Sequence, residues 1–472
     1  MSFFRMFCWT LLACLGFQAA NSQLRLPSVL ASGMVLQQQD SVPLWGWADP
    51  AQKVFVTTSW DNRTDSTVTG HGAKWMLKVK TPAAGGPYQV TIRAGQTRVL
   101  DNVMIGEVWI CSGQSNMEMN EGWGLPDVRA ELPTCSNARI RFFQVDKSTA
   151  DFPQDDCSGR WLPCDSNSLK HFSAVGYFFG KKLNQELNVP VGLISSNWGG
   201  TPAEVWTRAD RVTGDPELKA SADRQEDFAW WPREPGATFN AMIFPLTRFP
   251  LAGAIWYQGE GNTVAPQTYA KLFSTMIDSW RRAWNRNLPF YYVQIAPFTY
   301  GTTHVGDLVR EQQAQVQRMD QTGMVVITDL VNDTTDIHPK DKHDVGYRLA
   351  NYALAQTYHR SGTDYRSPSF QHMDLRQGKA YLSFSDAPGG LVIRGKAVRE
   401  LYVAGQDQVF YPAEARLEGE QLVVWSRQVR EPVAVRFGFS NAAVGNLFSR
   451  GGLPLCPFRT DNWPVEQVPV KK

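Results

Sequence analysis

Between residues 103 and 360 the chain repeats one pattern, in which a short apolar run is followed by a stretch with helical periodicity. The apolar runs predict strands at residues 107–112, 139–145, 191–196, 252–258, 290–296 and 323–330. Helical patterns lie between several of these runs, at residues 173–187, 268–284 and 306–319. This alternation predicts an α/β fold, with a parallel sheet between two layers of helices and any active site at the carboxyl ends of the strands.

The segments on either side consist of short alternating strands and turns. Before residue 103, strands are predicted at residues 42–48, 53–60, 75–81 and 88–94. After residue 360, strands are predicted at residues 379–385, 389–395, 400–405, 421–426 and 432–439. We therefore predict an N-terminal β-sandwich unit at residues 23–102, an α/β unit at residues 103–360 and a C-terminal β-domain at residues 361–472.

Composition narrows the class of partner. The 472 residues are 43% hydrophobic, which is enough to bury several cores. The formal net charge is +2 and no block of lysine and arginine occurs, so a nucleic-acid surface is not indicated. No segment after residue 22 is long and apolar enough to suggest a transmembrane helix.

The first 22 residues are typical of a secretory signal peptide. Arg5 precedes a short apolar run, and Ala20 and Ser22 supply small residues before the expected cleavage. We expect export to a periplasmic, extracellular or lumenal compartment; lipid attachment at Cys14 is a less favoured alternative, because it leaves an unusually short signal.

Five cysteines remain after this signal, so at least one has no disulfide partner within the chain. Cys157 and Cys164 flank a turn-rich stretch and are the favoured disulfide pair. The spacing of the cysteines matches no zinc site, and no metal is predicted.

Ser115 follows the first predicted strand of the α/β unit, where backbone N–H groups entering a helix can stabilise an oxyanion. The surrounding residues, Gly113-Gln114-Ser115-Asn116-Met117, lack the second glycine of the G-x-S-x-G motif. A serine at this position is either a nucleophile or a helix cap.

His338 is the histidine best placed to serve such a serine. It lies in a polar loop after the last predicted strand, two residues beyond Asp336. In extended backbone these two side chains face the same side, so the carboxylate could orient the imidazole and fix its tautomer. An exposed loop histidine is the alternative interpretation.

Two more loops follow predicted strands at the same edge of the sheet. One contains Gly199 and Gly200, whose backbone can approach a ligand closely. The other presents Gln258, Glu260 and Asn262 together. Either loop alone could be a solvated turn, but four polar, glycine-bearing loops at one edge indicate a site.

Five motifs in order resemble the sialate O-acetylesterase family, within the SGNH/GDSL-like group of serine hydrolases. They are CSGQSNMEM, SSNWGGTPAEVW, FNAMIFPL, WYQGEGN and DIHPKDKHDVGYRLA. The resemblance implies a secreted esterase with a three-layer, flavodoxin-like domain flanked by β-units, and it implies no cofactor.

The resemblance also implies roles for individual residues. Ser115 would be the nucleophile, His338 the general base and Asp336 its orienting acid. The oxyanion hole would combine the backbone N–H groups of Ser115, Gly199 and Gly200 with the side-chain amide of Gln258.

The broader group places its acid three residues before the histidine, where this chain has Thr335. Asp333 and Glu260 therefore stay open as alternative acids, and Asn116 is a further candidate for substrate contact.

The resulting hypothesis is a secreted carbohydrate O-acetylesterase that forms an acetyl-enzyme on Ser115 and acts on O-acetylated sialic acids. The alternatives are an esterase of the same mechanism on acetylated xylan or another polysaccharide, and a non-catalytic carbohydrate-binding protein. Residues 226–236, EDFAWWPREPG, are predicted to form either a lid or substrate wall, or a packed connector.

Overall fold

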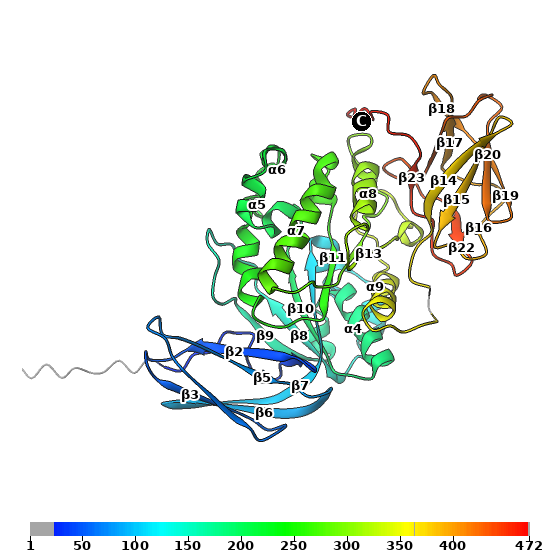
Figure 1. The fold of residues 1–472 in the computed structure, drawn as a ribbon. Helices are drawn as coiled ribbons and strands as arrows, with labels where there is room; N and C mark the ends of the chain where they lie inside the picture. The colour runs from blue at the N-terminus through cyan, green and yellow to red at the C-terminus, as the bar shows by residue number, and fades with distance from the viewer. Residues whose placement is uncertain (1–22, 363, 471–472) are drawn as a thin grey trace, which may run out of the picture.

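The computed structural model describes residues 23–362 and 364–470, and its centre is a mixed α/β unit built on a largely parallel sheet (Figure 1). Seven strands of this sheet run in the order β13-β12-β11-β7-β10-β8-β9. Neighbours from β13 to β8 pair in parallel, and β9 pairs antiparallel with β8. The bounds are β7 Gln96–Gly113, β8 Asn137–Val145, β9 Gly159–Cys164, β10 Val191–Asn197, β11 Gly253–Tyr257, β12 Phe290–Val293 and β13 Thr322–Val325.

Each of the six apolar runs predicted as strands overlaps a parallel strand of this sheet. The mixed α/β class with a parallel-containing sheet is therefore confirmed. The predicted signal peptide, residues 1–22, lies outside the described residues. Within the described part of the chain, no helix has the length and apolar character needed to cross a membrane.

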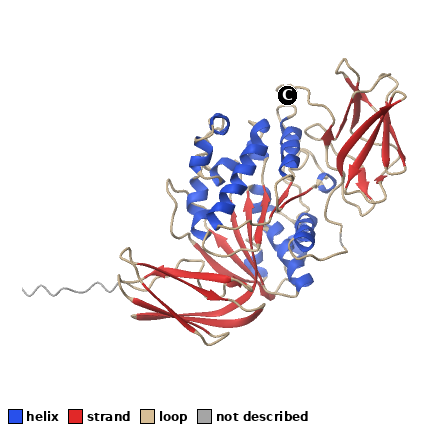
Figure 2. Ribbon diagram, in the orientation of Figure 1, coloured by secondary structure: helices blue, strands red, loops and turns tan. Residues whose placement is uncertain are grey.

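Helices cover both faces of the sheet, as Figure 2 shows. The side chains of β7 alternate between these faces: Val108 and Ile110 pack in the same cluster as α7, whereas Trp109 and Cys111 pack with α4 and α9. The long helices are α4 Ala174–Leu187, α7 Tyr269–Trp284, α8 Val305–Val316 and α9 His343–Gln356. Shorter helices are α1 Ser115–Glu118, α2 Pro126–Glu131, α3 Ser166–Leu169, α5 Ala209–Thr213 and α6 Pro216–Ala222.

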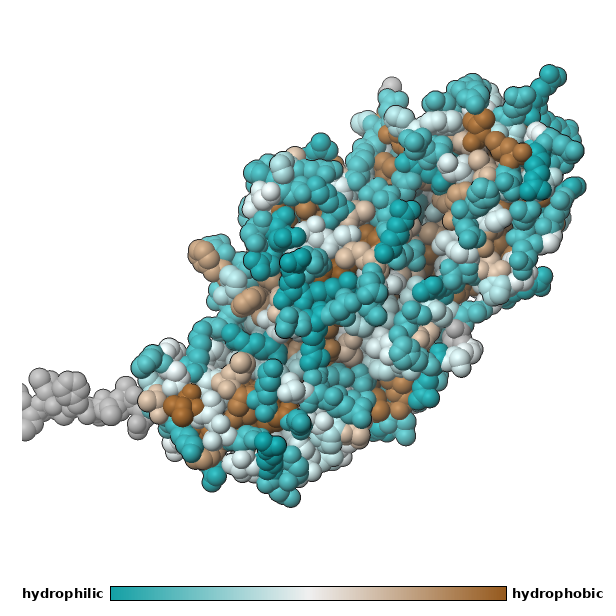
Figure 3. Space-filling model, in the orientation of Figure 1, coloured by the Kyte–Doolittle hydropathy of each residue, from teal (hydrophilic) through white to brown (hydrophobic). Residues whose placement is uncertain are grey.

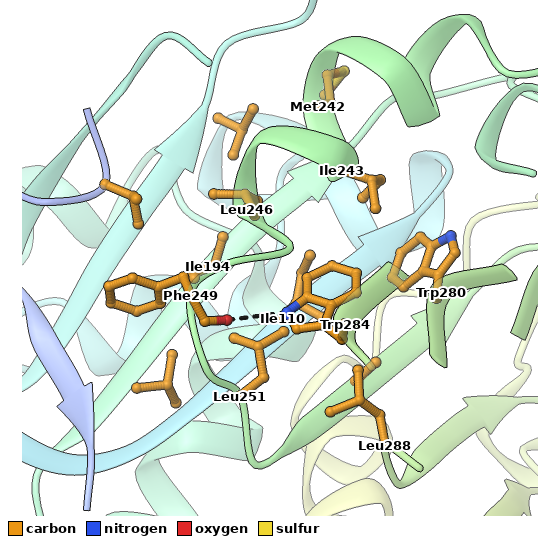
Figure 4. Close-up of a cluster of buried hydrophobic side chains, with 14 of the residues drawn as sticks. Ile110, Ile194, Met242, Ile243, Leu246, Phe249, Leu251, Trp280, Trp284 and Leu288 are labelled. Carbon is orange, nitrogen blue, oxygen red and sulfur yellow. Dashed lines mark hydrogen bonds between the residues drawn. The ribbon is translucent and has the colours of Figure 1, made fainter. Parts of the chain in front are cut away.

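The core beside α7 is rich in tryptophan (Figure 4). Trp280 and Trp284 lie one turn apart on the buried side of the helix, as the 3.6-residue period requires. The indole N–H of Trp284 donates to the carbonyl oxygen of Phe249 at 3.0 Å, so its polar atom is satisfied while its rings pack. This packing fixes α7 against one face of the sheet.

Strand β7 joins the N-terminal unit to the central sheet. Its first half pairs antiparallel with β6 and parallel with β1, and its second half pairs parallel with β10 and β11. Residues 102 and 103, on either side of the predicted domain boundary, thus belong to one continuous strand. One buried cluster also extends across both units. The N-terminal strands are β1 Val35–Gln37, β2 Ser41–Trp47, β3 Lys53–Thr58, β4 Thr64–Val68, β5 Lys74–Lys80 and β6 Gly85–Ala94.

The C-terminal strands form sheets of their own, apart from the central one (Figure 1). Two four-stranded sheets, β14-β15-β20-β19 and β18-β17-β21-β23, share one hydrophobic core, and β16 pairs with β22. This unit is attached to α8, where the buried Arg310 donates to the carbonyl oxygens of Ser440 and Asn441. The bounds are β14 Ser369–Arg376, β15 Lys379–Ser385, β16 Leu391–Ile393, β17 Leu401–Ala404, β18 Phe410–Pro412, β19 Glu414–Glu418, β20 Gln421–Trp425, β21 Ala434–Phe437, β22 Leu447–Ser449 and β23 Phe458–Arg459.

The predicted disulfide between Cys157 and Cys164 is wrong. Both thiols are buried and unbonded, and they pack in different hydrophobic clusters on either side of the sheet. The extended strand β9 between them keeps them apart. The thiol of Cys164 instead donates to the carbonyl oxygen of Cys135 at 3.1 Å, and burial raises the pKa of the Cys157 thiol to about 12.

Candidate active site

Ser115 is the first residue of α1, directly beyond the carboxyl end of β7. The chain turns there at Gly113, whose φ of 136° suits glycine and whose position against the backbone of Tyr257 leaves no room for a Cβ. As the first helical residue, Ser115 has no intrahelical acceptor for its N–H. Ser115 is 8% exposed and lines a surface cleft, so it is largely buried but still reachable from solvent.

His338 comes from the loop that connects β13 to α9, and the fold brings it to Ser115. Its Nε2 atom lies 2.9 Å from the Oγ atom of Ser115, which is hydrogen-bond distance for a nucleophile and its base. The ring of Trp123 packs edge-on against the imidazole, with centroids 5.2 Å apart. Burial, followed by the nearby Lys342 ammonium, lowers the pKa of His338, while Asp336 acts in the opposite direction.

Asp336 is the carboxylate that the structure places beside His338. Its Oδ1 atom accepts a hydrogen bond from the backbone N–H of His338 at 2.9 Å and lies 3.8 Å from the ring atom Nδ1. The other two predicted acids are engaged elsewhere. Asp333 accepts from the backbone and hydroxyl of Thr335, and Glu260 accepts from the side chain of Asn116.

Gly199 and Gly200 follow β10 and lie at the same edge of the sheet. A Cβ added at Gly199 would lie 3.4 Å from the Cβ of Ser115, so this backbone is next to the nucleophile. The N–H of Gly199 donates to Oε2 of Glu118 at 2.6 Å, and Oε1 of Glu118 accepts from Lys147 at 2.5 Å. The Glu118 carboxylate thus already accepts from the N–H of Gly199, one of the groups expected to bind the oxyanion.

Comparisons with known proteins agree with this geometry. Residues 105–355 match the family described as carbohydrate esterase, sialic acid-specific acetylesterase. The chain belongs to this family. That match spans all four loops described above, from Ser115 to His338.

Individual relatives cover most of this carbohydrate esterase. It is 28% identical over 408 residues to the human sialate O-acetylesterase, covering 78% of this chain and 77% of the relative. The mouse sialate O-acetylesterase is 29% identical over 432 residues, which cover 78% of this chain and 80% of the relative. A crystal structure of a carbohydrate acetylesterase from Xanthomonas citri is similar with a TM-score of 0.85 and 36% identity, covering 93% of this chain and all of that one. The protein is therefore a carbohydrate O-acetylesterase of the sialate O-acetylesterase type.

Gln258 does not lie where the expected oxyanion role requires. Its side chain is fully buried, and its Nε2 atom donates to the carbonyl oxygen of Thr201 at 3.2 Å and to Oδ1 of Asn262 at 2.8 Å. Its Oε1 atom accepts from the hydroxyl of Tyr269 at 2.8 Å. Because both amide hydrogens are used inside the esterase, Gln258 supports the loops and is not a donor to substrate.

Aromatic residues that sequence reasoning missed or left open form the walls of a cleft of about 590 Å³ around Ser115. Trp123 and Trp198 belong to the loops after β7 and β10, and nothing in their sequence context separates them from core tryptophans. The segment 226–236 supplies Phe228, Trp230 and Trp231, and the indole of Trp198 donates to the carbonyl oxygen of Trp230. This agrees with the substrate-wall alternative for that segment.

In the face that Figure 3 shows, hydrophobic residues occur as separate patches among hydrophilic ones. Another hollow, of about 710 Å³, lies along β8 and β9. His171 lines this hollow, and its backbone N–H donates to the carbonyl oxygen of Ser168. Within the described residues, no three histidine, cysteine or acidic side chains gather as a metal site.

Proposed function

We propose that this carbohydrate esterase is a serine O-acetylesterase with Ser115 as the nucleophile and His338 as the general base. The observation that supports this best is the 2.9 Å contact between Nε2 of His338 and Oγ of Ser115 in an open cleft. A serine hydroxyl is a weak nucleophile until an adjacent base takes its proton, and this pair has the distance that such a transfer needs.

The reaction would proceed in two halves. Oγ of Ser115 bonds to the acetyl carbonyl carbon while Nε2 of His338 takes the hydroxyl proton, and the intermediate then expels the sugar oxygen, which receives that proton. Water next attacks the acetyl-enzyme with His338 as base, which releases acetate and restores Ser115. The N–H groups of Ser115 and the Gly199–Gly200 turn would hold the developing oxyanion, which requires Glu118 to release the N–H of Gly199.

Single and double substitutions test this assignment. Ser115→Ala and His338→Ala should each remove most acetate release, and the double variant should lose little more, because the two groups act as one unit. A non-catalytic carbohydrate-binding protein would release no acetate in any form. Full activity in Ser115→Ala would contradict the proposal.

Two substrate classes have support. The family description and the names of the mammalian relatives favour O-acetylated sialic acids. The charges of the cleft favour a neutral acetylated polysaccharide such as acetylated xylan. Among the described residues that line the cleft there is no arginine, and Lys147 is already paired with Glu118.

The remaining charges strengthen that second candidate. Glu226 lines the cleft and would repel the carboxylate of a sialic acid, whereas the charge of Glu118 is offset by its pairing with Lys147. Aromatic faces, in contrast, offer apolar surface to a pyranose ring. Acetate release from O-acetylated sialic acid and from acetylated xylan, compared at equal acetyl concentration with Ser115→Ala as the blank, separates the two. A higher kcat/KM on xylan is the result that the cleft charges favour.

The proposal takes the central unit as a three-layer, flavodoxin-like esterase domain between two β-sandwich units, which the helices on both faces of the sheet support. We also propose that the protein is exported after cleavage behind Ser22, on the basis of the sequence alone.

A further inference from the structure

Lys342 is a fully buried lysine at the end of the loop that carries His338. Its Nζ atom donates to Oδ1 of Asn116 at 2.7 Å and lies 5.2 Å above the ring of Tyr257. Its backbone N–H donates to Oδ2 of Asp127 at 2.8 Å, which fixes the start of α9. Burial of a lysine side chain costs solvation free energy, which the contacts of its Nζ atom must offset.

The side chain of Asn116 links three segments of the site. Besides accepting from Lys342, it donates through Nδ2 to Oε1 of Glu260 at 2.7 Å and to the carbonyl oxygen of Ile337 at 3.1 Å. Lysine is only a donor, and the Ile337 carbonyl is only an acceptor, so the amide can satisfy both in one orientation alone. Lys342 therefore reinforces, from the Oδ1 side, the orientation in which Nδ2 points to Ile337 and Glu260.

This orientation ties the nucleophile to its base through their chain neighbours. Asn116 directly follows Ser115, and Ile337 directly precedes His338. We propose that Lys342 is a positioning residue, whose buried Nζ fixes the Asn116 amide and thereby holds the His338 loop in register with Ser115. This inference rests on the proposed roles of Ser115 and His338.

The charge of Lys342 gives the inference a second readout, the pH dependence of activity. The groups facing Lys342 are Glu260 from the loop after β11, Asp127 from α2, the ring of Tyr257 from β11, and Asp336, His338 and Lys340 from its own loop. Burial lowers the pKa of Lys342 to about 7, and burial raises the pKa of Glu260. The Lys342 charge also lowers the pKa of His338, so its removal should shift the histidine midpoint to higher pH.

Lys342→Met tests the inference because methionine keeps much of the apolar stem and removes the donor. We expect kcat to fall by ~10–10²-fold with little change in KM, since a misplaced base impairs the transition state more than binding. The acid-side midpoint of kcat/KM should move to higher pH. Lys219→Met is the matched control and should keep wild-type kinetics, because Lys219 is an exposed lysine on α6 whose Nζ pairs with Asp223.

Asn116→Ala provides an independent variant in case Lys342→Met folds poorly. Because Lys342 acts through the side-chain amide of Asn116, the double variant should lose little more kcat than either single variant. Folded fraction is measured by thermal unfolding, and kcat is expressed per folded molecule. A wild-type kcat and pH midpoint per folded Lys342→Met molecule, or fully additive losses in the double variant, would overturn the positioning role. Full activity of Ser115→Ala would instead overturn the proposed function and is read out separately.

Discussion

Asp336 holds His338 through the backbone, because its Oδ1 atom accepts from the His338 N–H at 2.9 Å while lying 3.8 Å from ring atom Nδ1. The carboxylate is therefore close enough to favour the imidazolium that forms during catalysis, and it fixes the loop at the same time. Asp333 and Glu260 make their side-chain hydrogen bonds to Thr335 and Asn116 instead.

Asp336→Asn should keep the fold and lower kcat by at least ~10²-fold, with a smaller effect on KM, because the base loses its orienting charge. Steady-state kinetics on a chromogenic acetate ester measures this. Asp333→Asn is the matched control, since the carboxylate of Asp333 accepts from Thr335, and this variant should behave as wild type. An active Asp336→Asn beside an inactive Asp333→Asn would show that the acid is misassigned.

The pH dependence should show a base with a depressed pKa. Burial and then the charge of Lys342 lower the pKa of His338, which extends its neutral, active form to more acidic pH. The kcat/KM profile should rise through a midpoint below the ordinary histidine value of ~6.5 and level off above it. A midpoint above that value would mean that the Asp336 carboxylate outweighs burial.

Gln258→Ala should lower the stability of the protein more than its catalytic rate. The substitution removes the side-chain amide from Thr201, Asn262 and Tyr269. Asn262 still accepts from the N–H of Ala203, and Tyr269 still donates to the backbone carbonyl of residue 258. The carbonyl oxygen of Thr201 loses its amide donor, and an orphaned buried group costs about 1–3 kcal/mol. Thermal unfolding should show a clearly lower Tm, while kcat per folded molecule stays within roughly threefold of wild type. An unchanged Tm with a kcat reduced ~10²-fold would restore Gln258 as an oxyanion donor.

Gly200→Ala should disturb the aromatic wall of the cleft. Gly200 has a φ of 82°, and a Cβ there would collide with the ring of Trp231. We expect kcat/KM to fall by ~10-fold or more, because both the turn and the wall must move. Gly72→Ala, where an added Cβ meets no atom within 4 Å, is the matched control. Equal kinetics for both variants would exclude a role for this turn.

Sequence reasoning located the strands of the central sheet because buried parallel strands are continuous apolar runs. It missed β9, Gly159–Cys164, whose Arg160 and Pro163 break such a run and suit an antiparallel edge strand. It also placed a boundary inside β7, because a strand that passes from one sheet into another changes its partners without a turn residue.

The site was predictable to the level of loops but not of side-chain direction. Ser115, His338 and Asp336 lie together because the carboxyl ends of parallel strands share one edge. Gln258 comes from the same edge but points into the core, which depends on Tyr269 and Asn262. Lys342 lies in a polar loop of the sequence, and its burial depends on contacts from distant segments, with Asp127 of α2 and Tyr257 of β11.

Labelling with a fluorophosphonate, followed by mass-spectrometric mapping of the modified serine, tests the central assignment most directly. The hydrogen bond between Ser115 and His338 predicts one label, on Ser115, that forms slowly in His338→Ala and disappears in Ser115→Ala. A label on another serine, such as the buried Ser112, or unchanged labelling in Ser115→Ala, would contradict it.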